Sequence, residues 1–169
     1  MVTFYTATSL DGFLATLDDD VSWLDRLPPP NEDTYVPFLE SIGAIAMGKS
    51  TYEFLLRHVA QGHDWPYPDR PVWVFTHGAF ASRAGVTFVS GDVATVYPDM
   101  ASHGNVWVVG GGELAGQFLD AGLLDELVVT VASRTLGAGK ALLPRDATFE
   151  LVSARPLGKG FAELRYRVA

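Results

Sequence analysis

The chain has 169 residues, of which 48% are hydrophobic and 19% are charged, and its formal net charge at pH 7 is −8. These totals predict one globular domain over residues 1–169, and the acidic balance excludes the basic surface that a nucleic-acid partner needs. Cysteine is absent, which excludes disulfides and thiolate catalysis, and no apolar run approaches the roughly 18 residues of a membrane span.

The order of apolar and polar segments predicts an α/β fold. In chain order we expect a strand at 2–8, a turn at Asp11-Gly12, a loop over 18–33 with a helical turn at 22–26, a helix at 34–42, a strand at 44–48, a helix from 50, a loop at 61–70, strands at 71–76 and 86–90, a weak helix at 91–103, a strand at 105–110, a helix to about 121, a strand at 125–133, a loop at 137–143, and a hairpin of 147–155 and 160–168. This alternation predicts a mostly parallel central sheet flanked by helices and closed by a C-terminal antiparallel hairpin.

Three consecutive glycines, Gly110, Gly111 and Gly112, separate a predicted strand from the helix that follows it. The first N–H groups of a helix and the helix dipole suit phosphate oxygens, and glycine lets a ligand approach the backbone closely. The alternative is a tight turn that only needs positive φ. Three glycines ahead of a helix favour anion binding.

Two familiar nucleotide-binding patterns fit poorly. The glycine spacing at 110, 112 and 116 is not the dinucleotide-binding fingerprint, and no acidic residue ends the next strand. The segment "GAIAMGKST" at 43–51 matches a Walker pattern, but its "AIAM" is typical of a strand rather than of a loop. A P-loop phosphotransferase is therefore the weakest functional hypothesis.

Two further junctions carry phosphate-friendly groups. The first is "MGKSTYE" at 47–53, where Ser50 is the expected N-cap and Glu53 completes a capping box. The second is "VFTHG" at 74–78, at the carboxyl end of a predicted strand. Ligands of open α/β sheets bind at this edge, so the three junctions together predict one extended ligand with several phosphates, such as a dinucleotide.

The segments "TSLDGFLA", "MGKSTYE", "VFTH", "VVGGGELAGQFLDAGLLDEL" and "LGAGKALLP" occur in this order. As a set they resemble the dihydrofolate-reductase-like superfamily, and within it the stand-alone relatives of the C-terminal reductase domain of riboflavin biosynthesis. The resemblance implies a dihydrofolate-reductase-like fold, NADPH as the cofactor, assembly as a homodimer, and a cis peptide between Gly110 and Gly111.

The resemblance also implies roles for individual residues. The cofactor phosphates would be bound by Gly48, Lys49, Ser50 and Thr51, and the adenosine end with its 2′-phosphate would be bound by Thr76 and His77. The pyrophosphate would be bound by Gly110, Gly111, Gly112, Glu113 and Leu114. The nicotinamide and substrate side would be lined by Ala7, Ser9, Leu10 and Asp11.

The chain departs from the riboflavin-pathway reductases at two positions. They tend to have a lysine after the S-x-D-G segment and a glutamate before the final glycine pair, where this chain has Phe13 and Gly110. The lost lysine is a cation that could meet a phosphorylated substrate. The cofactor half of the resemblance is therefore more complete than the substrate half.

The sequence offers several candidates for the substrate side. Asp11 is the candidate proton source, with a turn aspartate bound to its own backbone as the alternative, and Glu32, Asp33 and Glu40 are further acids in the region where folate enzymes place theirs. Trp23 and Phe38 are candidates to sandwich a flat heterocycle, with a place in the core as the alternative. No histidine or acidic residue has metal-ligand spacing, so we expect no metal.

The sequence therefore leads to two main hypotheses. The first is a cytoplasmic, NADPH-dependent reductase that transfers a hydride to a small pyrimidine- or pterin-like heterocycle, in the manner of 5-amino-6-(5-phosphoribosylamino)uracil reductase or dihydrofolate reductase. The second is a non-catalytic NADP(H)-binding protein that keeps the fold without the reductase chemistry. Both expect a small-molecule ligand, no nucleic acid and no membrane.

Overall fold

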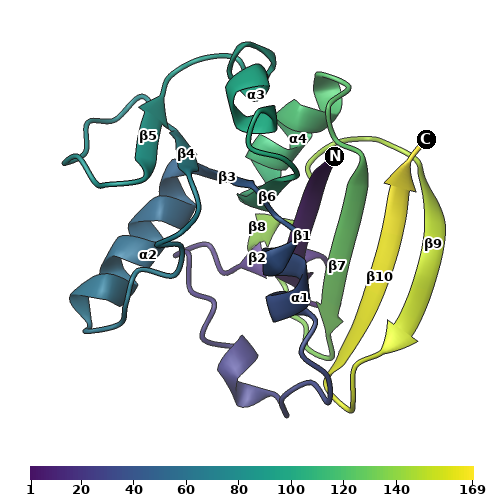
Figure 1. Cartoon of the computed structure of the whole chain (residues 1–169). Coiled ribbons are helices and arrows are strands. Elements are labelled where there is room, and N and C mark those ends of the chain that lie inside the picture. Colours follow the sequence, from purple (N-terminus) through teal and green to yellow (C-terminus); the bar gives the residue numbers. More distant parts are fainter.

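The fold is an eight-stranded sheet with helices on both faces, seen here in a computed structural model that describes residues 1–169 (Figure 1). In chain order the elements are β1 (Val2–Thr8), β2 (Phe13–Ala15), a 3-10 helix (Leu24–Arg26), α1 (Tyr35–Glu40), β3 (Ala44–Gly48), α2 (Lys49–Ala60), β4 (Val72–Phe75), β5 (Val86–Val89), α3 (Val93–Ala101), β6 (Val106–Gly110), α4 (Gly112–Asp120), β7 (Glu126–Ala132), β8 (Lys140–Ala141), β9 (Phe149–Pro156) and β10 (Phe161–Val168). None of the helices combines the length and the apolar character needed to cross a membrane.

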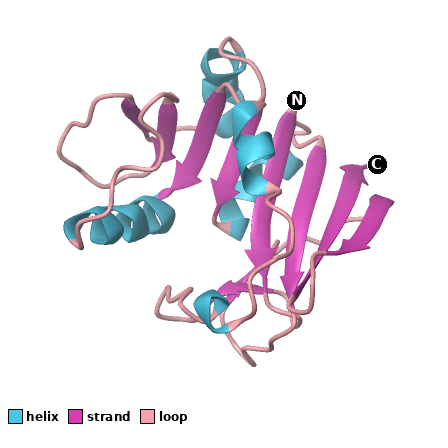
Figure 2. Ribbon diagram, turned by 60° about the horizontal axis from the view of Figure 1, so that its bottom comes forward, coloured by secondary structure: helices cyan, strands magenta, loops and turns pink.

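The large sheet has the strand order β5-β4-β3-β6-β1-β7-β10-β9 (Figure 2). The strands from β5 to β7 in this order run parallel, whereas β10 pairs antiparallel with both β7 and β9. A mostly parallel sheet with a closing antiparallel hairpin confirms the predicted fold class. Because the parallel strands share one direction, their carboxyl ends meet at one edge of the sheet.

The two faces of the sheet carry separate apolar cores. On one face, Val93 and Met100 of α3 and Phe118 of α4 pack against Phe4 and Val108 of the sheet. The second core lies under α1 and α2. Its fully or nearly fully buried members are Ile42, Ile45, Met47, Tyr52, Leu55, Tyr67, Val72, Val74 and Trp107. Burial on both faces explains why β3, β4 and β6 read as continuous apolar runs rather than as alternating ones.

The start of α2 differs from the prediction. The helix begins at Lys49, and its N-cap is Gly48, which provides no side-chain cap. Ser50 is therefore not the N-cap, and the predicted capping box with Glu53 is wrong. Glu53 instead lies 3.6 Å from the Lys49 ammonium, one helical turn away. The earlier start leaves the first N–H groups of α2 without side-chain partners.

The segment predicted as a loop at 137–143 contains the short strand β8, which pairs with β2 in a separate two-stranded sheet. Such a strand has no periodicity of its own, because its partner lies more than a hundred residues earlier in the chain. Gly139 is required here, since a Cβ would overlap the Ala15 carbonyl oxygen. The small sheet places residues 13–15 and 139–141 side by side at the carboxyl edge of the large sheet.

Gly43, at the beginning of β3, gives a test of the packing at the opposite edge. A Cβ on Gly43 would overlap the backbone carbonyl of His103, and this backbone has little freedom to retreat because Gly43 N–H donates to Asn105 O at 2.9 Å. We expect Gly43→Ala to lower the free energy of unfolding by about 1–3 kcal/mol, the usual cost of overpacking. Urea unfolding followed by circular dichroism measures the change.

The control is Gly91→Ala, because a Cβ at Gly91 meets nothing within 4 Å. Equal urea midpoints for Gly43→Ala and the unmodified protein would contradict the close approach of β3 to the His103 carbonyl.

Candidate functional site

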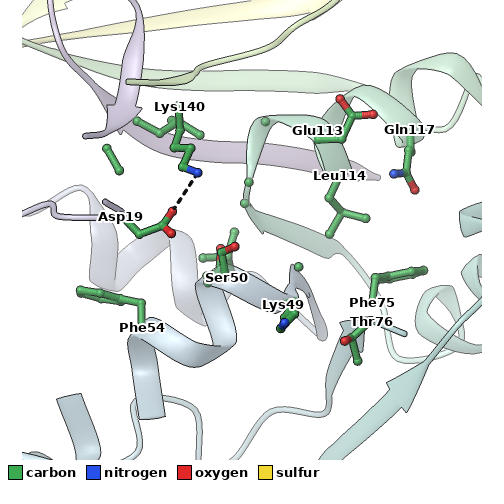
Figure 3. Close-up of a pocket in the computed structure, with 18 of the residues that line it drawn as sticks. Asp19, Lys49, Ser50, Phe54, Phe75, Thr76, Glu113, Leu114, Gln117 and Lys140 are labelled. Atoms are coloured by element: carbon green, nitrogen blue, oxygen red, sulfur yellow. Dashed lines mark ion pairs between the residues drawn. The ribbon is translucent and has the colours of Figure 1, made fainter. Parts of the chain in front are cut away.

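A cavity of about 730 Å³ opens at the carboxyl edge of the parallel strands. Its walls come from the ends of β3, β4, β5 and β6, from the first turns of α2 and α4, and from the small β2–β8 sheet (Figure 3). The predicted cofactor-binding residues that line it are Gly48, Lys49, Ser50, Thr51, Thr76, His77, Gly110, Gly111, Gly112, Glu113 and Leu114. The structure thus brings the three predicted junctions to one cavity, which we call the first cavity.

Each of the three glycines is required for a different reason. Gly110 has φ of +149°, in the region that side chains rarely adopt. A Cβ on Gly112 would overlap the carbonyl oxygens of Ala141 and Leu142, so this glycine lets α4 contact the β8 segment. A Cβ on Gly111 meets nothing within 4 Å, and this residue faces the first cavity. Only Gly111 therefore keeps space free for a ligand. The peptide bond between Gly110 and Gly111 is cis, as the resemblance implied.

The first turns of α2 and α4 both face the first cavity. Neither helix has a side-chain cap, because their N-caps are Gly48 and Gly111. Their leading N–H groups and the positive ends of two helix dipoles therefore point at the same space, which suits an anion. The hydroxyl of Thr51 adds a donor here, since its oxygen lies 3.6 Å from the Cβ position of Gly110.

Cationic side chains line this cavity together with two carboxylates, Asp19 and Glu113. Lys49 and Lys140, two of the three lysines in the sequence, line it together with His77. Figure 3 shows Lys140 and Asp19 on one side of the cavity, 3.9 Å apart, and the first turn of α4 on the other. Sequence reasoning missed Lys140, which is placed by the pairing of β2 with β8, and Asp19, which follows β2 by four residues.

The far end of the cavity lies at β4 and β5. The hydroxyl of Thr76 accepts a hydrogen bond from Gly78 N at 2.9 Å and keeps its own proton free to donate. Ser90 and Gly91 line the same end and were missed by the sequence analysis. The rule that identified Thr76 and His77, that polar residues following a parallel strand lie at the ligand edge, also applies to them.

Glu113 is the one acidic side chain on the α4 wall. The Arg145 guanidinium forms a bidentate pair with it, at 2.8 and 3.0 Å, and this hydrogen bonding lowers the pKa of Glu113. Arg145 also contacts Asp120 at 2.8 Å. The carboxylate of Glu113 is therefore turned to a fixed partner, and what it offers to an anion is its backbone N–H.

A second cavity of about 690 Å³ lies on the sheet face that carries α1. Its lining residues are Tyr5, Thr6, Ala7, Leu24, Pro29, Pro30, Asn31, Glu32, Asp33, Thr34, Tyr35, Tyr67, Trp107, Val109, Thr130, Leu157 and Phe161. Thr6 of β1 and Val109 of β6 line both cavities. The two spaces therefore adjoin at the ends of two neighbouring strands. Ala7, predicted on the nicotinamide and substrate side, faces this second cavity.

Asp11 has a structural role in the turn rather than a place in either cavity. Its carboxylate accepts hydrogen bonds from Ser9 Oγ at 2.6 Å, from Leu136 N at 3.0 Å and from Gly137 N at 2.7 Å. The Ser9 hydroxyl and these amides lower its pKa to about 2. This geometry contradicts Asp11 as the proton source, because the group is anionic near neutral pH and all its bonds stabilise that form.

Ser9 and Leu10 also lie outside both cavities. Ser9 is fully buried, and its hydroxyl is used twice in the turn, donating to Asp11 and accepting from Phe13 N at 2.9 Å. Leu10 is exposed to solvent. Their predicted contact with the cofactor is therefore not supported by this geometry.

The two aromatic residues predicted to sandwich a substrate belong to the packed interior. Trp23 is 3% exposed, and Phe38 stacks on Tyr5 with ring centroids 4.4 Å apart. Neither lines a cavity, so the alternative of a core position is the one the structure supports. The aromatic residues that do face the second cavity are Tyr5, Tyr35, Tyr67, Trp107 and Phe161, and none of them was among the residues predicted to sandwich a substrate.

The remaining sequence candidates are also placed by the structure. Glu32 and Asp33 line the second cavity, whereas Glu40 lines neither. Gly43 and Gly48 lie at opposite ends of β3, so the Walker-like segment is a strand and not a loop. No group of three or more histidine, aspartate or glutamate side chains gathers where it could hold a metal ion.

Comparison with known proteins gives this architecture a family. The model of the RibD C-terminal domain matches residues 69–162, which is more than half of the chain. The chain belongs to the RibD C-terminal domain family. The structure is similar to the crystal structure of a "putative riboflavin biosynthesis protein" from Shewanella sp. PV-4, with a TM-score of 0.85 and 27% sequence identity. The match covers 99% of this chain and 98% of that one.

Two relatives from Bacillus subtilis (strain 168) are similar over nearly their whole length. YwjB is 29% identical over 170 residues, covering 96% of this chain and 94% of its own. YyaP is 21% identical over 174 residues, covering 95% and 90%. Both carry the description "uncharacterized protein", so their similarity to this chain brings no demonstrated reaction with it.

The Asp11 turn gives a pH-dependent prediction. The folded-state pKa of about 2 is below the usual value near 3.9, so the stabilisation is present in full above about pH 5 and is lost as the pH falls through the folded-state value. We expect Asp11→Ala to lower the urea midpoint at pH 7, and the difference from the unmodified protein to shrink between pH 5 and pH 3. A difference that stays constant over this range would show that the carboxylate is not what holds residues 136 and 137.

Proposed function

We propose that this protein is an NADPH-dependent reductase that transfers a hydride to a small pyrimidine- or pterin-like heterocycle. The observation that carries the proposal is the wall shared by the two cavities, Thr6 and Val109. A ligand in one cavity lies next to a ligand in the other, as hydride transfer requires. The RibD C-terminal domain family and the riboflavin-associated structural neighbour support a reductase-like fold for this arrangement.

The residues of the first cavity fit a dinucleotide. Two helix N-termini without side-chain caps suit the two linked phosphates, and the open space over Gly111 lets a pyrophosphate approach the backbone. Lys49, Thr76 and His77 lie around α2 and β4, where a 2′-phosphate on the adenosine end would meet a cation and two donors. A reduced nicotinamide coenzyme supplies the hydride when bound.

The chain's own contribution to the reaction is to place the two ligands and to exclude water. Thr6 and Val109 line both cavities, so the reacting rings would meet at this shared border. The apolar and aromatic lining of the second cavity favours a flat ring over water. Reductases of the two pathways named by the resemblance, acting on a phosphoribosylaminouracil or on dihydrofolate, are the models for this proposal.

The alternative is a non-catalytic NADP(H)-binding protein. The use of Asp11 in a turn favours it, as does the presence of Phe13 where riboflavin-pathway reductases tend to have lysine. Binding of NADPH without turnover on a panel of pterins, pyrimidines and quinones would decide for this alternative. The proposal also includes a homodimer and a cytoplasmic setting, which analytical ultracentrifugation and cell fractionation test.

Lys49→Ala tests the 2′-phosphate assignment. Lys49 is half-exposed and its pair with Glu53 at 3.6 Å is weak, so its ammonium is free to contact a phosphate. We expect the variant to bind NADPH more weakly by about 1–2 kcal/mol and to bind NADH almost unchanged, as measured by isothermal titration calorimetry. Lys159→Ala, in the β9–β10 turn, is the control. Equal losses of affinity for NADPH and NADH would show that Lys49 does not contact the 2′-phosphate.

Gly111→Val tests the pyrophosphate assignment. The added side chain extends into the open part of the first cavity and not into packed structure, because a Cβ at this position has no neighbour within 4 Å. We expect loss of measurable NADPH binding in the titration, with the far-ultraviolet circular dichroism spectrum retained. Ala154→Val, on the exposed strand β9, is the matched control. Undiminished NADPH binding in Gly111→Val would place the coenzyme elsewhere.

A further inference from the structure

The ionisable side chains around the second cavity all carry one sign of charge or none. Glu32 and Asp33 are the acidic residues that line it, and no lysine, arginine or histidine does. The first cavity differs, because Lys49, Lys140 and His77 line it alongside Asp19 and Glu113. A substrate with a phosphate group would therefore meet two carboxylates and no cation.

Two guanidiniums on β9 and β10, those of Arg155 and Arg165, are held by carboxylates. Arg155 contacts Glu32 at 2.8 Å and Glu163 at 3.0 Å, and Arg165 contacts Glu163 at 3.2 Å. Arg165 also lies 3.7 Å from Glu126. Three carboxylates and two guanidiniums give this network a net negative charge, so it supplies no spare cation to the cavity.

Glu163 adds a buried negative charge behind the cavity wall. Glu163 is 1% exposed, and its Oε1 accepts hydrogen bonds from both Arg155 and Arg165. Its other oxygen, Oε2, is buried without a hydrogen-bond partner. Glu163 pairs across the sheet with Thr130 and stands two residues from Phe161, and both of these line the cavity. Burial is the main reason why the pKa of the Tyr5 hydroxyl is raised; the charges of Glu163 and Asp33 act in the same direction, and Thr34 and Arg165 act against it.

Aromatic rings make up much of the remaining wall. Trp107 lies edge-on to Tyr5, Tyr35 and Tyr67, with ring centroids 6.2, 5.9 and 5.6 Å away. Aromatic rings attract organic cations through their negative faces, and the attraction grows when water is excluded. Aromatic walls combined with two lining carboxylates and no lining cation are suited to a flat, positively charged ligand.

We propose that the substrate of the second cavity is a planar heterocyclic cation without a phosphate group, whose hydride acceptor is the carbon of a C=N⁺ bond. This inference rests on the proposed reductase function. When such a carbon takes up a hydride, the π electron pair moves to nitrogen and cancels its charge. The atoms and the charge then balance without a proton.

A cationic acceptor accounts for the absence of an available acid. Glu32 is paired with Arg155, and Asp33 accepts from the N–H groups of Tyr35 and Val36 at 2.9 and 3.1 Å, so both carboxylates act as acceptors. Burial raises the pKa of the Tyr35 and Tyr67 hydroxyls, which makes both of them weaker proton donors than an ordinary tyrosine. A substrate that arrives with its positive charge needs none of these groups as a proton donor.

Three flat bicycles of nearly equal size test the proposal by charge alone: N-methylquinolinium (+1), 1-methylnaphthalene (neutral) and 1-naphthoate (−1). We measure the dissociation constant of each for the full-length protein by tryptophan fluorescence and calorimetry. We expect the cation to bind at least about tenfold more tightly than the neutral ring, and the anion more weakly than both. Gly111→Val, which obstructs the first cavity, leaves this order unchanged.

Variants then connect the preference with the named carboxylates. Glu32→Gln and Asp33→Asn are each expected to reduce the cation-to-neutral ratio by about threefold or more, because each removes one negative charge from the lining. Asp33→Asn keeps an oxygen to accept the helix N–H groups. Asp99→Asn, exposed on α3 and on the other face of the sheet, is the charge-matched control and leaves the ratio unchanged.

The proposal is overturned if the neutral or anionic ring binds as tightly as the cation, if none of the three binds, or if the preference does not respond to Glu32 and Asp33. These results are separate from the test of the reductase. If NADPH does not bind, the coenzyme assignment is wrong but the charge preference of the second cavity can still hold. If NADPH binds and the three bicycles bind with equal affinity, only the proposal of a cationic substrate is wrong.

Discussion

The parallel pairing of β6 between β3 and β1 is the constraint on which both cavities depend. Val106 is in register with Ala44 on one side and with Val2 on the other, so the three strands reach the same edge of the sheet together. The helices that follow β3 and β6 must then begin side by side, and their first N–H groups face a common space. The contact of Gly112 with the Ala141 and Leu142 carbonyls closes that space from the β8 side. A shift of one strand would separate the helix N-termini and move Thr6 away from Val109.

The parts of the fold and site that sequence reasoning predicted are those encoded by neighbours in the chain. A buried strand followed by glycine and a helix is a local pattern, and it identified the junctions at 48–51 and 110–114, which the structure brings to one cavity. The misplaced start of α2 has the same origin, since Ser50 and Glu53 fit a capping box locally. There the geometry of Gly48 at the strand end determined the N-cap instead.

What the sequence did not predict depends on partners far apart in the chain. Lys140 reaches the first cavity only because β8 pairs with β2, and the carboxylate of Asp11 is bound by amides about 125 residues away. The aromatic wall around Trp107 draws on β1, α1, the loop at 61–70 and β6, and each of its rings is equally plausible in a core. Backbone-based anion binding can therefore be recognised from local sequence, whereas the side-chain surroundings of a substrate cannot.

The distribution of charge shows why the net value of −8 says so little about ligands. The chain places two of its three lysines at one cavity and no cation at the adjoining one. The helix N-termini and lysines on one side of Thr6 and Val109, and the carboxylates without a lining cation on the other, would sort two ligands by charge, with the polyanion on the first side and the ring on the second. Because the two spaces adjoin at Thr6 and Val109, this sorting also fixes which ends of the ligands meet. The arrangement needs no ordered acid between them, provided that the charge needed for reduction arrives with the substrate.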